Sequence, residues 1–184
     1  MTYLGIDIGS TCAKSVIMNK ERGILDTFVI PTGWSSLEAL KEIKEKLRIK
    51  GYNFEDMYCI STGYGRQAVE GAKKRVTEIT CHAKGASVLF GEDTFNIVDI
   101  GGQDTKVISC HKGKVMEFYM NDKCSAGTGK FLEIMANRLN VTLADLDRIA
   151  RDHTEQLQIS AMCTVFAESE IVSLIGQGTS KPNI

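Results

Sequence analysis

One glycine-rich stretch sets a cysteine directly before a helix pattern. Residues 121–130 hold Cys124, Gly127 and Gly129 and lead into apolar residues at helical spacing, namely Phe131, Leu132, Met135 and Leu139. Free N–H groups at the start of a helix bind anions, because they carry the positive end of the helix dipole. The same environment stabilises a thiolate, the form of cysteine that binds metal or attacks as a nucleophile. The stretch therefore indicates two kinds of chemistry, phosphate binding and thiolate chemistry.

A second cysteine, Cys163, also lies just before a predicted helix, 39 residues after Cys124. Iron–sulfur clusters are held by thiolates, and a cubane cluster takes four of them. This pair supplies two, so a [4Fe–4S] cluster would be shared by two copies of the chain across a two-fold axis. Two buried or capping cysteines are the alternative that the residues by themselves leave open.

The other four cysteines carry no comparable signal. Cys12, Cys59 and Cys110 lie in or beside apolar runs typical of strands, where a free cysteine usually serves as a small buried hydrophobe. Cys81 precedes His82, but no second pair has the spacing of a zinc site. The chain has no C-x-x-C pair, so a dense disulfide scaffold is not expected.

A strand–turn–strand pattern occurs twice, at an offset of 92 residues. An apolar run reaches Asp7, turns at Gly9 and resumes, and the same happens at Asp99 and Gly101. Two such glycine turns can hold a phosphate chain through backbone N–H groups. Carboxylates at the strand ends can hold Mg²⁺ through its waters. The alternative is two ordinary hairpins with Asp and Gly as turn formers, although turn chemistry alone does not require a duplicated pattern.

These turns supply most of the candidate site residues. The candidate catalytic residues, which hold the metal or position water and phosphate, are Asp7, Asp99, Gln103 and Asp104. The candidate nucleotide contacts are Gly9, Ser10, Thr11, Gly101, Gly102, Gly127 and Gly129. The last two glycines lie beside Cys124, so they would couple the nucleotide site to the thiolate site.

The elements that must position these residues form two lobes. In the first lobe, the hairpin is followed by a predicted strand at 24–30 and a predicted helix with an apolar stripe at 37–47. A strand at 57–61 and a glycine turn at 62–66 come next. The lobe ends with short helices at 67–74 and 82–91 on either side of a weak strand at 76–79. In the second, a strand at 114–119 precedes helices at 128–139, 143–151 and 165–176, with a short strand near 157–160. The second lobe lacks clear strands after its helices, so we expect its C-terminal part to be missing.

Composition is that of an ordinary globular protein. Of the 184 residues, 43% are hydrophobic and 24% charged, and the formal net charge is −1. The chain shows no basic stripe with interleaved aromatics, which argues against a nucleic-acid partner. No apolar run approaches the roughly 18 residues that span a bilayer, and the N-terminus lacks a signal-peptide layout. We expect a cytoplasmic protein with no membrane or nucleic-acid partner.

The two hairpins resemble the phosphate motifs of the acetate kinase, sugar kinase, Hsp70 and actin superfamily. Within it, the chain most resembles the activators (component A) of 2-hydroxyacyl-CoA dehydratases, in the BadF/BadG/BcrA/BcrD-type ATPase family. The segments that carry this resemblance are Leu4–Thr11, Thr62–Arg66, Val98–Val107, Met120–Phe131 and Cys163–Glu170. The last two are specific to the group, because sugar kinases and Hsp70 lack these cysteines.

The resemblance implies an α/β fold of duplicated ribonuclease-H-like, actin-like ATPase lobes with mixed sheets, at 1–94 and 95–184. It also implies ATP and Mg²⁺ in the cleft and one [4Fe–4S] cluster per homodimer, held by Cys124 and Cys163 of both subunits. Reduced ferredoxin or flavodoxin would supply one electron, which ATP would drive to a (R)-2-hydroxyacyl-CoA dehydratase.

Three other functions stay open at this point. The ATPase subunit of an aryl-CoA (benzoyl-CoA) reductase is similar in the same segments. A small-molecule kinase of the superfamily would use the two turns but would not need Cys124 or Cys163. A non-catalytic dimerisation or zinc-binding fragment would need neither turn for chemistry.

Overall fold

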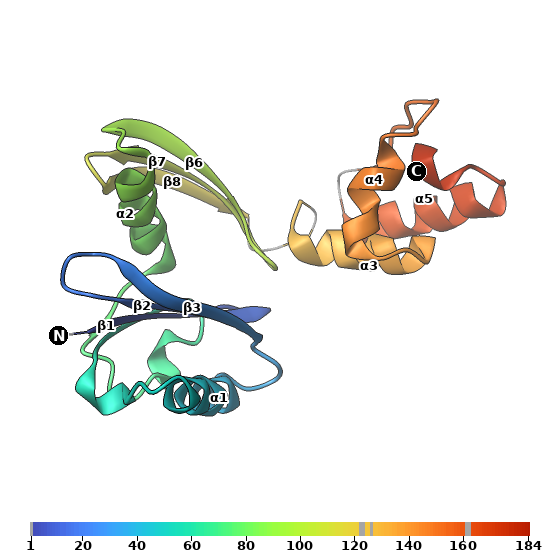
Figure 1. The fold of residues 1–184 in the computed structure, drawn as a ribbon. Coiled ribbons are helices and arrows are strands. Elements are labelled where there is room, and N and C mark those ends of the chain that lie inside the picture. The colour runs from blue at the N-terminus through green and yellow to red at the C-terminus, as the bar shows by residue number, and fades with distance from the viewer. Residues whose placement is uncertain (1, 122–123, 126, 161–162) are drawn as a thin grey trace. The chain divides into compact units, whose positions relative to one another are not determined.

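The computed structural model describes residues 2–121, 124–125, 127–160 and 163–184 (Figure 1). The chain divides into two compact units. One comprises Met1–Ile97 and Ile108–Glu117, and the other comprises Val98–Val107 and Phe118–Ile184. Among the described residues, every helix is too short or too polar to cross a membrane.

A five-stranded mixed sheet lies at the centre of the first unit, in the order β3-β2-β1-β4-β5. Its strands are β1 (Tyr3–Ile8), β2 (Cys12–Met18), β3 (Ile24–Pro31), β4 (Tyr58–Thr62) and β5 (Lys74–Arg75). β1 pairs antiparallel with β2 and parallel with β4. Alternate residues of β1 (Leu4, Ile6 and Ile8) are buried, as expected for a strand with one face on the core. The opposite face of β1 carries Asp7.

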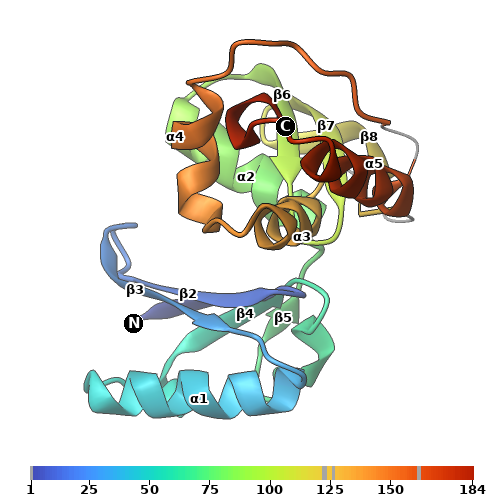
Figure 2. The same ribbon diagram turned by 90° about the vertical axis from the view of Figure 1, so that its right-hand side faces the viewer.

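Helix α1 (Ser36–Ile49) covers one face of this sheet (Figures 1 and 2). The Ser35 hydroxyl accepts the N–H of Glu38 at 3.4 Å, which caps the helix as the Ser-x-x-Glu spacing predicts. The apolar stripe of α1 contributes Leu40, Ile43 and Leu47 to the same core cluster as the inward side chains of β1. The first strand is therefore held by a well-packed core on one side.

Between β4 and the next helix, the sequence-based prediction was wrong. Residues 67–74 do not form an α-helix; only the short 3-10 helix η2 (Arg66–Ala68) overlaps the start of this range. The strand lies at Lys74–Arg75 instead of 76–79. Gly71 has φ +86, a left-handed conformation that ends a helix. Helix α2 (Glu78–Phe90) begins four residues earlier than predicted, because the Thr77 side chain accepts the Thr80 N–H and caps it.

A three-stranded sheet follows, in the order β6-β7-β8. Its strands are β6 (Thr94–Ile100), β7 (Thr105–His111) and β8 (Lys114–Asn121). The two-residue turn between β7 and β8 has positive φ at Lys112 and Gly113, which matches the twist of a tight hairpin. In the first unit, Ala83 of α2 packs with Ile108 and Cys110 of β7 in a second core cluster.

The second unit is mainly helical. Helices α3 (Gly129–Leu139), α4 (Leu146–Ala150) and α5 (Thr164–Gly176) occupy the predicted regions, with the short 3-10 helices η3 (Leu143–Asp145) before α4 and η4 (Lys181–Asn183) near the end. Met135, Leu139 and Ile171 join α3 to α5 in a third cluster.

The short strand predicted near 157–160 was wrong, since these residues have no regular secondary structure. Ile159 packs against the third cluster instead. The Ser160 N–H donates to the Glu170 carboxylate of α5 at 2.6 Å. This backbone N–H therefore bonds to a side chain and not to the carbonyl of a neighbouring strand.

Candidate functional site

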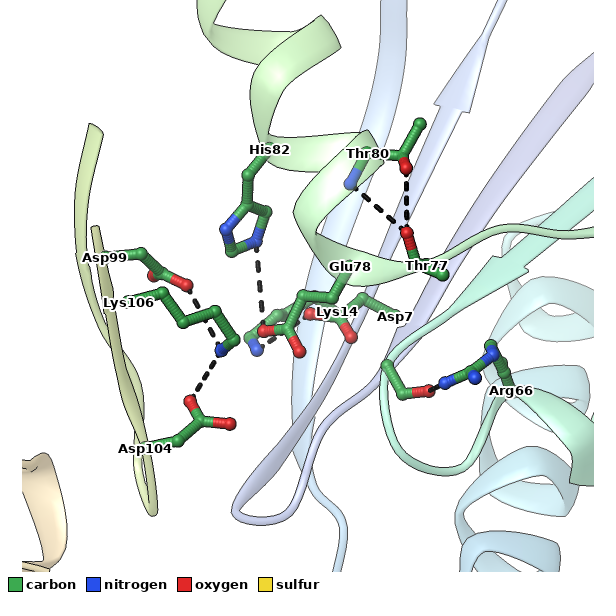
Figure 3. A network of polar contacts seen from close by, with 11 residues as sticks. Asp7, Lys14, Arg66, Thr77, Glu78, Thr80, His82, Asp99, Asp104 and Lys106 are labelled. Atoms are coloured by element: carbon green, nitrogen blue, oxygen red, sulfur yellow. Dashed lines mark hydrogen bonds and ion pairs between the residues drawn. The ribbon is translucent and has the colours of Figure 1, made fainter. Parts of the chain in front are cut away.

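The first glycine turn joins β1 to β2. The Gly9 N–H donates to the Cys12 carbonyl at 3.1 Å and closes the turn. Asp7, at the end of β1, lies opposite Lys14 in the strand register, and its Oδ2 is 2.9 Å from the lysine Nζ (Figure 3). The Thr32 hydroxyl donates to the Gly9 carbonyl at 2.8 Å and ties β3 to the turn. Ser10 and Thr11 complete the loop, and Thr11 is exposed.

The second turn repeats this geometry at the same offset. The Gly101 N–H donates to the Asp104 carbonyl at 2.8 Å. The Lys106 Nζ lies 3.4 Å from Asp99 Oδ2 and 2.6 Å from Asp104 Oδ1 (Figure 3). Gln103 lies in this turn, between Gly102 and Asp104. The structure thus brings Asp99 and Asp104 together around Lys106, beside the turn glycines.

The two lysines were missed as site residues by the sequence analysis. The signal was available, since both turns have the spacing Asp-x6-Lys. Their surroundings differ, because the Lys106 side chain is 3% exposed and the Lys14 side chain 51% exposed. The buried lysine is fixed between two carboxylates, whereas the exposed one is accessible to a ligand.

One carboxylate oxygen of Asp7 has no hydrogen-bond partner among the described residues. Its Oδ1 is buried without a hydrogen-bond partner in the described part of the chain, as is the Thr62 hydroxyl opposite it in β4. Gly63 approaches so closely that a Cβ there would lie 2.3 Å from this Oδ1. A buried carboxylate oxygen is costly unless a water or cation reaches it. Hard oxygen donors are what Mg²⁺ prefers, so the residues fit a magnesium ion and its waters.

The glycine-rich loop before α3 is bonded directly to the second turn. The N–H groups of Gly129 and Lys130, the first residues of α3, donate to the carbonyls of Gly101 and Gly102, each at 2.9 Å. These two N–H groups are therefore engaged inside the protein. Thr128, not a cysteine, is the N-cap of α3, and its hydroxyl accepts the Phe131 N–H at 3.5 Å.

The segments that hold Cys124 and Cys163 meet through the residues that follow them. Ser125 Oγ and Thr164 Oγ1 lie 2.8 Å apart in a hydrogen bond. Cys163 is the N-cap of α5, and Cys124 and Cys163 are both partly exposed. Two accessible sulfurs on joined segments are soft donors suited to iron or zinc. The neighbouring residues Asp122, Lys123, Ala126, Ala161 and Met162 lie outside the described residues.

Cys59 and Cys110 differ from this pair. Both are buried. Burial raises the pKa of the Cys59 thiol to about 11 and also raises the pKa of Cys110, because an apolar environment disfavours the thiolate. These two cysteines are neutral packing groups at ordinary pH, as predicted.

Brief treatment of the native protein with iodoacetamide at pH 8 should therefore label Cys124 and Cys163 well before Cys59 and Cys110. Only the thiolate reacts, and Cys59 should stay slow until the pH approaches 11. Mass spectrometry of peptides gives the rate at each site, and a urea-unfolded sample is the control in which all rates converge. Labelling of native Cys59 as fast as Cys124 would contradict this assignment.

Two Asp-Gly turns with paired lysines, on mixed sheets with helices, define an α/β ATPase of the duplicated ribonuclease-H-like, actin-like class. The chain belongs to the BadF/BadG/BcrA/BcrD ATPase family, whose sequence profile matches residues 4–184. The predicted family and fold class are thereby confirmed, and the protein is an ATPase of this family.

Curated proteins are similar in sequence to this chain over nearly its whole length. The (R)-2-hydroxyglutaryl-CoA dehydratase activating ATPase of Acidaminococcus fermentans is 43% identical over 183 residues, which cover 98% of this chain and 70% of that protein. The activator of lactoyl-CoA dehydratase of Anaerotignum propionicum is 42% identical, with 100% and 71% covered. A benzoyl-CoA reductase subunit of Thauera aromatica is 26% identical, with 98% and 66% covered.

Two solved structures share the fold closely. Component A of the Acidaminococcus fermentans (R)-2-hydroxyglutaryl-CoA dehydratase matches with a TM-score of 0.90 at 42% identity, covering 100% of this chain and 71% of that one. The activator of the 2-hydroxyisocaproyl-CoA dehydratase from Clostridium difficile, with bound ADPNP, matches with a TM-score of 0.90 at 37% identity, with 100% and 69% covered.

Proposed function

We propose that this ATPase activates a (R)-2-hydroxyacyl-CoA dehydratase in the cytoplasm by ATP-dependent transfer of one electron. The observation that carries this proposal is the hydrogen bond between Ser125 and Thr164 at 2.8 Å. It joins both cysteine segments beside a loop that is bonded to the second glycine turn. Two relatives, at 43% and 42% identity, are named for the activation of such dehydratases.

The nucleotide site would be built from both turns, in lobes that span residues 1–94 and 95–184. Asp7 and Asp99 would hold Mg²⁺ through its waters, and the unsatisfied Oδ1 of Asp7 supports that role. Gln103 and Asp104 would position water and phosphate at the second turn. The phosphate contacts would come from Ser10, Thr11, Gly102 and Gly127. Gly9, Gly101 and Gly129, whose N–H groups donate to carbonyls within the chain, would let the phosphate approach the backbone closely.

The electron site would need a homodimer, because each chain offers two accessible thiols on joined segments, Cys124 and Cys163. When bound, a [4Fe–4S] cluster supplies one-electron chemistry. The chain's own part would be to hold the two sulfur-bearing segments together at the start of α5. The bond between Ser125 and Thr164 keeps the two sulfur-bearing segments together before any iron arrives.

ATP would act through the second turn. A nucleotide shifts a conformational equilibrium only if it binds the two states unequally. The first two N–H groups of α3 donate to the carbonyls of Gly101 and Gly102. A change in the conformation of that turn would therefore also move the loop that holds Cys124. The electron would come from reduced ferredoxin or flavodoxin and pass to the dehydratase component.

A second candidate is the ATPase subunit of an aryl-CoA reductase. The similarity to the benzoyl-CoA reductase subunit of Thauera aromatica favours it, but at 26% identity against 43% for the dehydratase activator. We place it second for that reason.

Two variants, compared in one anaerobic experiment, test both sites. After reconstitution with iron and sulfide, the wild-type chain should carry about four iron atoms per dimer and absorb visible light. Cys124→Ser should lose the iron but keep ADPNP binding. Asp7→Asn should keep the iron but lose Mg²⁺-dependent ATP hydrolysis, since an amide cannot replace the carboxylate on the metal's waters.

The results would separate the alternatives. A colourless, iron-free wild type after reconstitution would rule out the electron-transfer proposal, and bound zinc would point to a zinc-binding role. Unchanged hydrolysis by Asp7→Asn would remove Asp7 from the ATPase site. Transfer of phosphate to an added sugar or carboxylate would favour a kinase.

A further inference from the structure

A chain of hydroxyl contacts leads from the second glycine turn to both cysteine segments. The Thr105 hydroxyl, at the start of β7, donates to the Gly127 carbonyl at 2.6 Å. The Thr128 hydroxyl donates to the Ser125 carbonyl at 2.5 Å. The Ser125 hydroxyl then meets that of Thr164 at 2.8 Å. Four hydroxyl-bearing side chains thus connect β7, the loop before α3 and the start of α5.

Among the described residues, Thr105 contributes a side-chain hydrogen bond to the junction between the turn and the loop. Backbone bonds also cross this junction, from the Gly129 and Lys130 N–H groups to the carbonyls of Gly101 and Gly102. Gly127 has φ +76, and a Cβ there would meet no atom of the described residues within 4 Å. The hydrogen bond from Thr105 therefore holds this glycine of the loop against the strand that follows Asp104.

The far end of this chain is firmly held. Thr128 and Thr164 are both buried, and Ala167 donates its N–H to the Cys163 carbonyl at 3.0 Å at the start of α5. A displacement of Gly127 and of Thr128 beside it is therefore passed to Ser125 through the bond from the Thr128 hydroxyl to the Ser125 carbonyl. Ser125 follows Cys124 directly. Through Thr164, the same displacement reaches Cys163.

We propose that Thr105 is a positioning residue that makes both cysteines respond to the nucleotide at the second turn. The inference rests on the proposed function, and it adds a named residue and a route within one subunit. Thr105 acts through Gly127 rather than on the nucleotide itself. Loss of its hydroxyl should weaken the coupling while leaving nucleotide binding and the cysteines in place.

The test uses the cluster-free full chain under anaerobic conditions. Alkylation rates of Cys124 and Cys163 are measured by mass spectrometry with and without Mg-ADPNP, whose binding is measured separately by equilibrium dialysis. Coupling between sites is typically worth about fivefold or more, so ADPNP should change both rates in the wild type by about that factor. Thr105→Val should cut the change to below about twofold, because one hydrogen bond accounts for most of such a factor.

Two further variants keep the result specific. Thr105→Ser retains the hydroxyl and should restore the wild-type response, which a purely structural role for the threonine methyl would not predict. Ser125→Ala breaks the link to Thr164, so Cys124 should keep its response while Cys163 loses it. Cys59, buried in another unit, serves as the internal reference whose rate should not change.

A full nucleotide response in Thr105→Val would overturn the inference, as would Thr105→Ser behaving like Thr105→Val. Wild-type binding of ADPNP with no change at either cysteine would also overturn it and leave the ATPase function standing. Failure of the wild type to bind ADPNP in dialysis would instead count against the proposed function itself. Alkylation rates therefore test the inference about Thr105, and equilibrium dialysis tests the proposed function.

Discussion

Replacing Lys106 by methionine should destabilise the protein by about 3–5 kcal/mol, because it removes the cation that lies against the buried Asp104 carboxylate and the partly buried Asp99 carboxylate. The Lys106 side chain is 3% exposed and lies 2.6 Å from Asp104 and 3.4 Å from Asp99. Methionine preserves most of the side-chain volume, so the loss reports mainly on charge. Urea denaturation gives the free energy of unfolding directly.

The other turn supplies a matched control. Lys14 occupies the corresponding position, 2.9 Å from Asp7, but its side chain is half exposed. Exposed ion pairs contribute little, so Lys14→Met should cost less than about 1 kcal/mol. If both variants lost equal stability, burial would not distinguish the two turns, and the assignment of Lys106 as the fixed lysine would be wrong.

Replacing Gly63 by alanine should be comparably damaging, for a steric reason. Gly63 has φ +84, and a Cβ would lie 2.3 Å from Asp7 Oδ1 and 2.4 Å from the Ile8 carbonyl oxygen. The left-handed backbone costs about 1–2 kcal/mol for an L-residue, and relief of the overlap adds about 1–3 kcal/mol. Because Asp7 must move, Mg²⁺-dependent ATP hydrolysis should fall as well.

A control variant at Gly51 separates the backbone cost from the steric cost. Its φ is +83, almost that of Gly63, but a Cβ there would meet no atom within 4 Å. Gly51→Ala should therefore show only the backbone cost of about 1–2 kcal/mol and keep its ATP hydrolysis. Equal losses in the two variants, with hydrolysis intact in both, would mean that the close approach to Asp7 has no consequence.

The long helices were predictable because their signals are local. The Ser35 cap and the apolar stripe of α1 lie within one stretch of sequence, and the structure uses both. Short elements failed for the opposite reason. β5 has two residues and exists through its pairing with β4, while Ser160 is held by Glu170 of α5. Neither partner is visible in the local pattern.

The sequence by itself determined the chemical groups and their duplication. Asp, Gly and Lys recur at one offset of 92 residues, and a hairpin with that spacing sets Asp opposite Lys by register alone, as β1 and β2 do. The two cysteines are visible in the sequence, and the segments that hold them carried much of the resemblance to the family. These features depend only on chain connectivity and strand geometry.

The tertiary structure decided which of the repeated groups are buried and which distant ones meet. Lys106 is enclosed and Lys14 is not, although their local sequences match. The first N–H groups of α3 donate to carbonyls of the second turn. Ser125 is hydrogen-bonded to Thr164, which lies 39 residues further along the chain. Burial and long-range contact depend on packing by segments far away in the chain, and no local pattern encodes which segments those are.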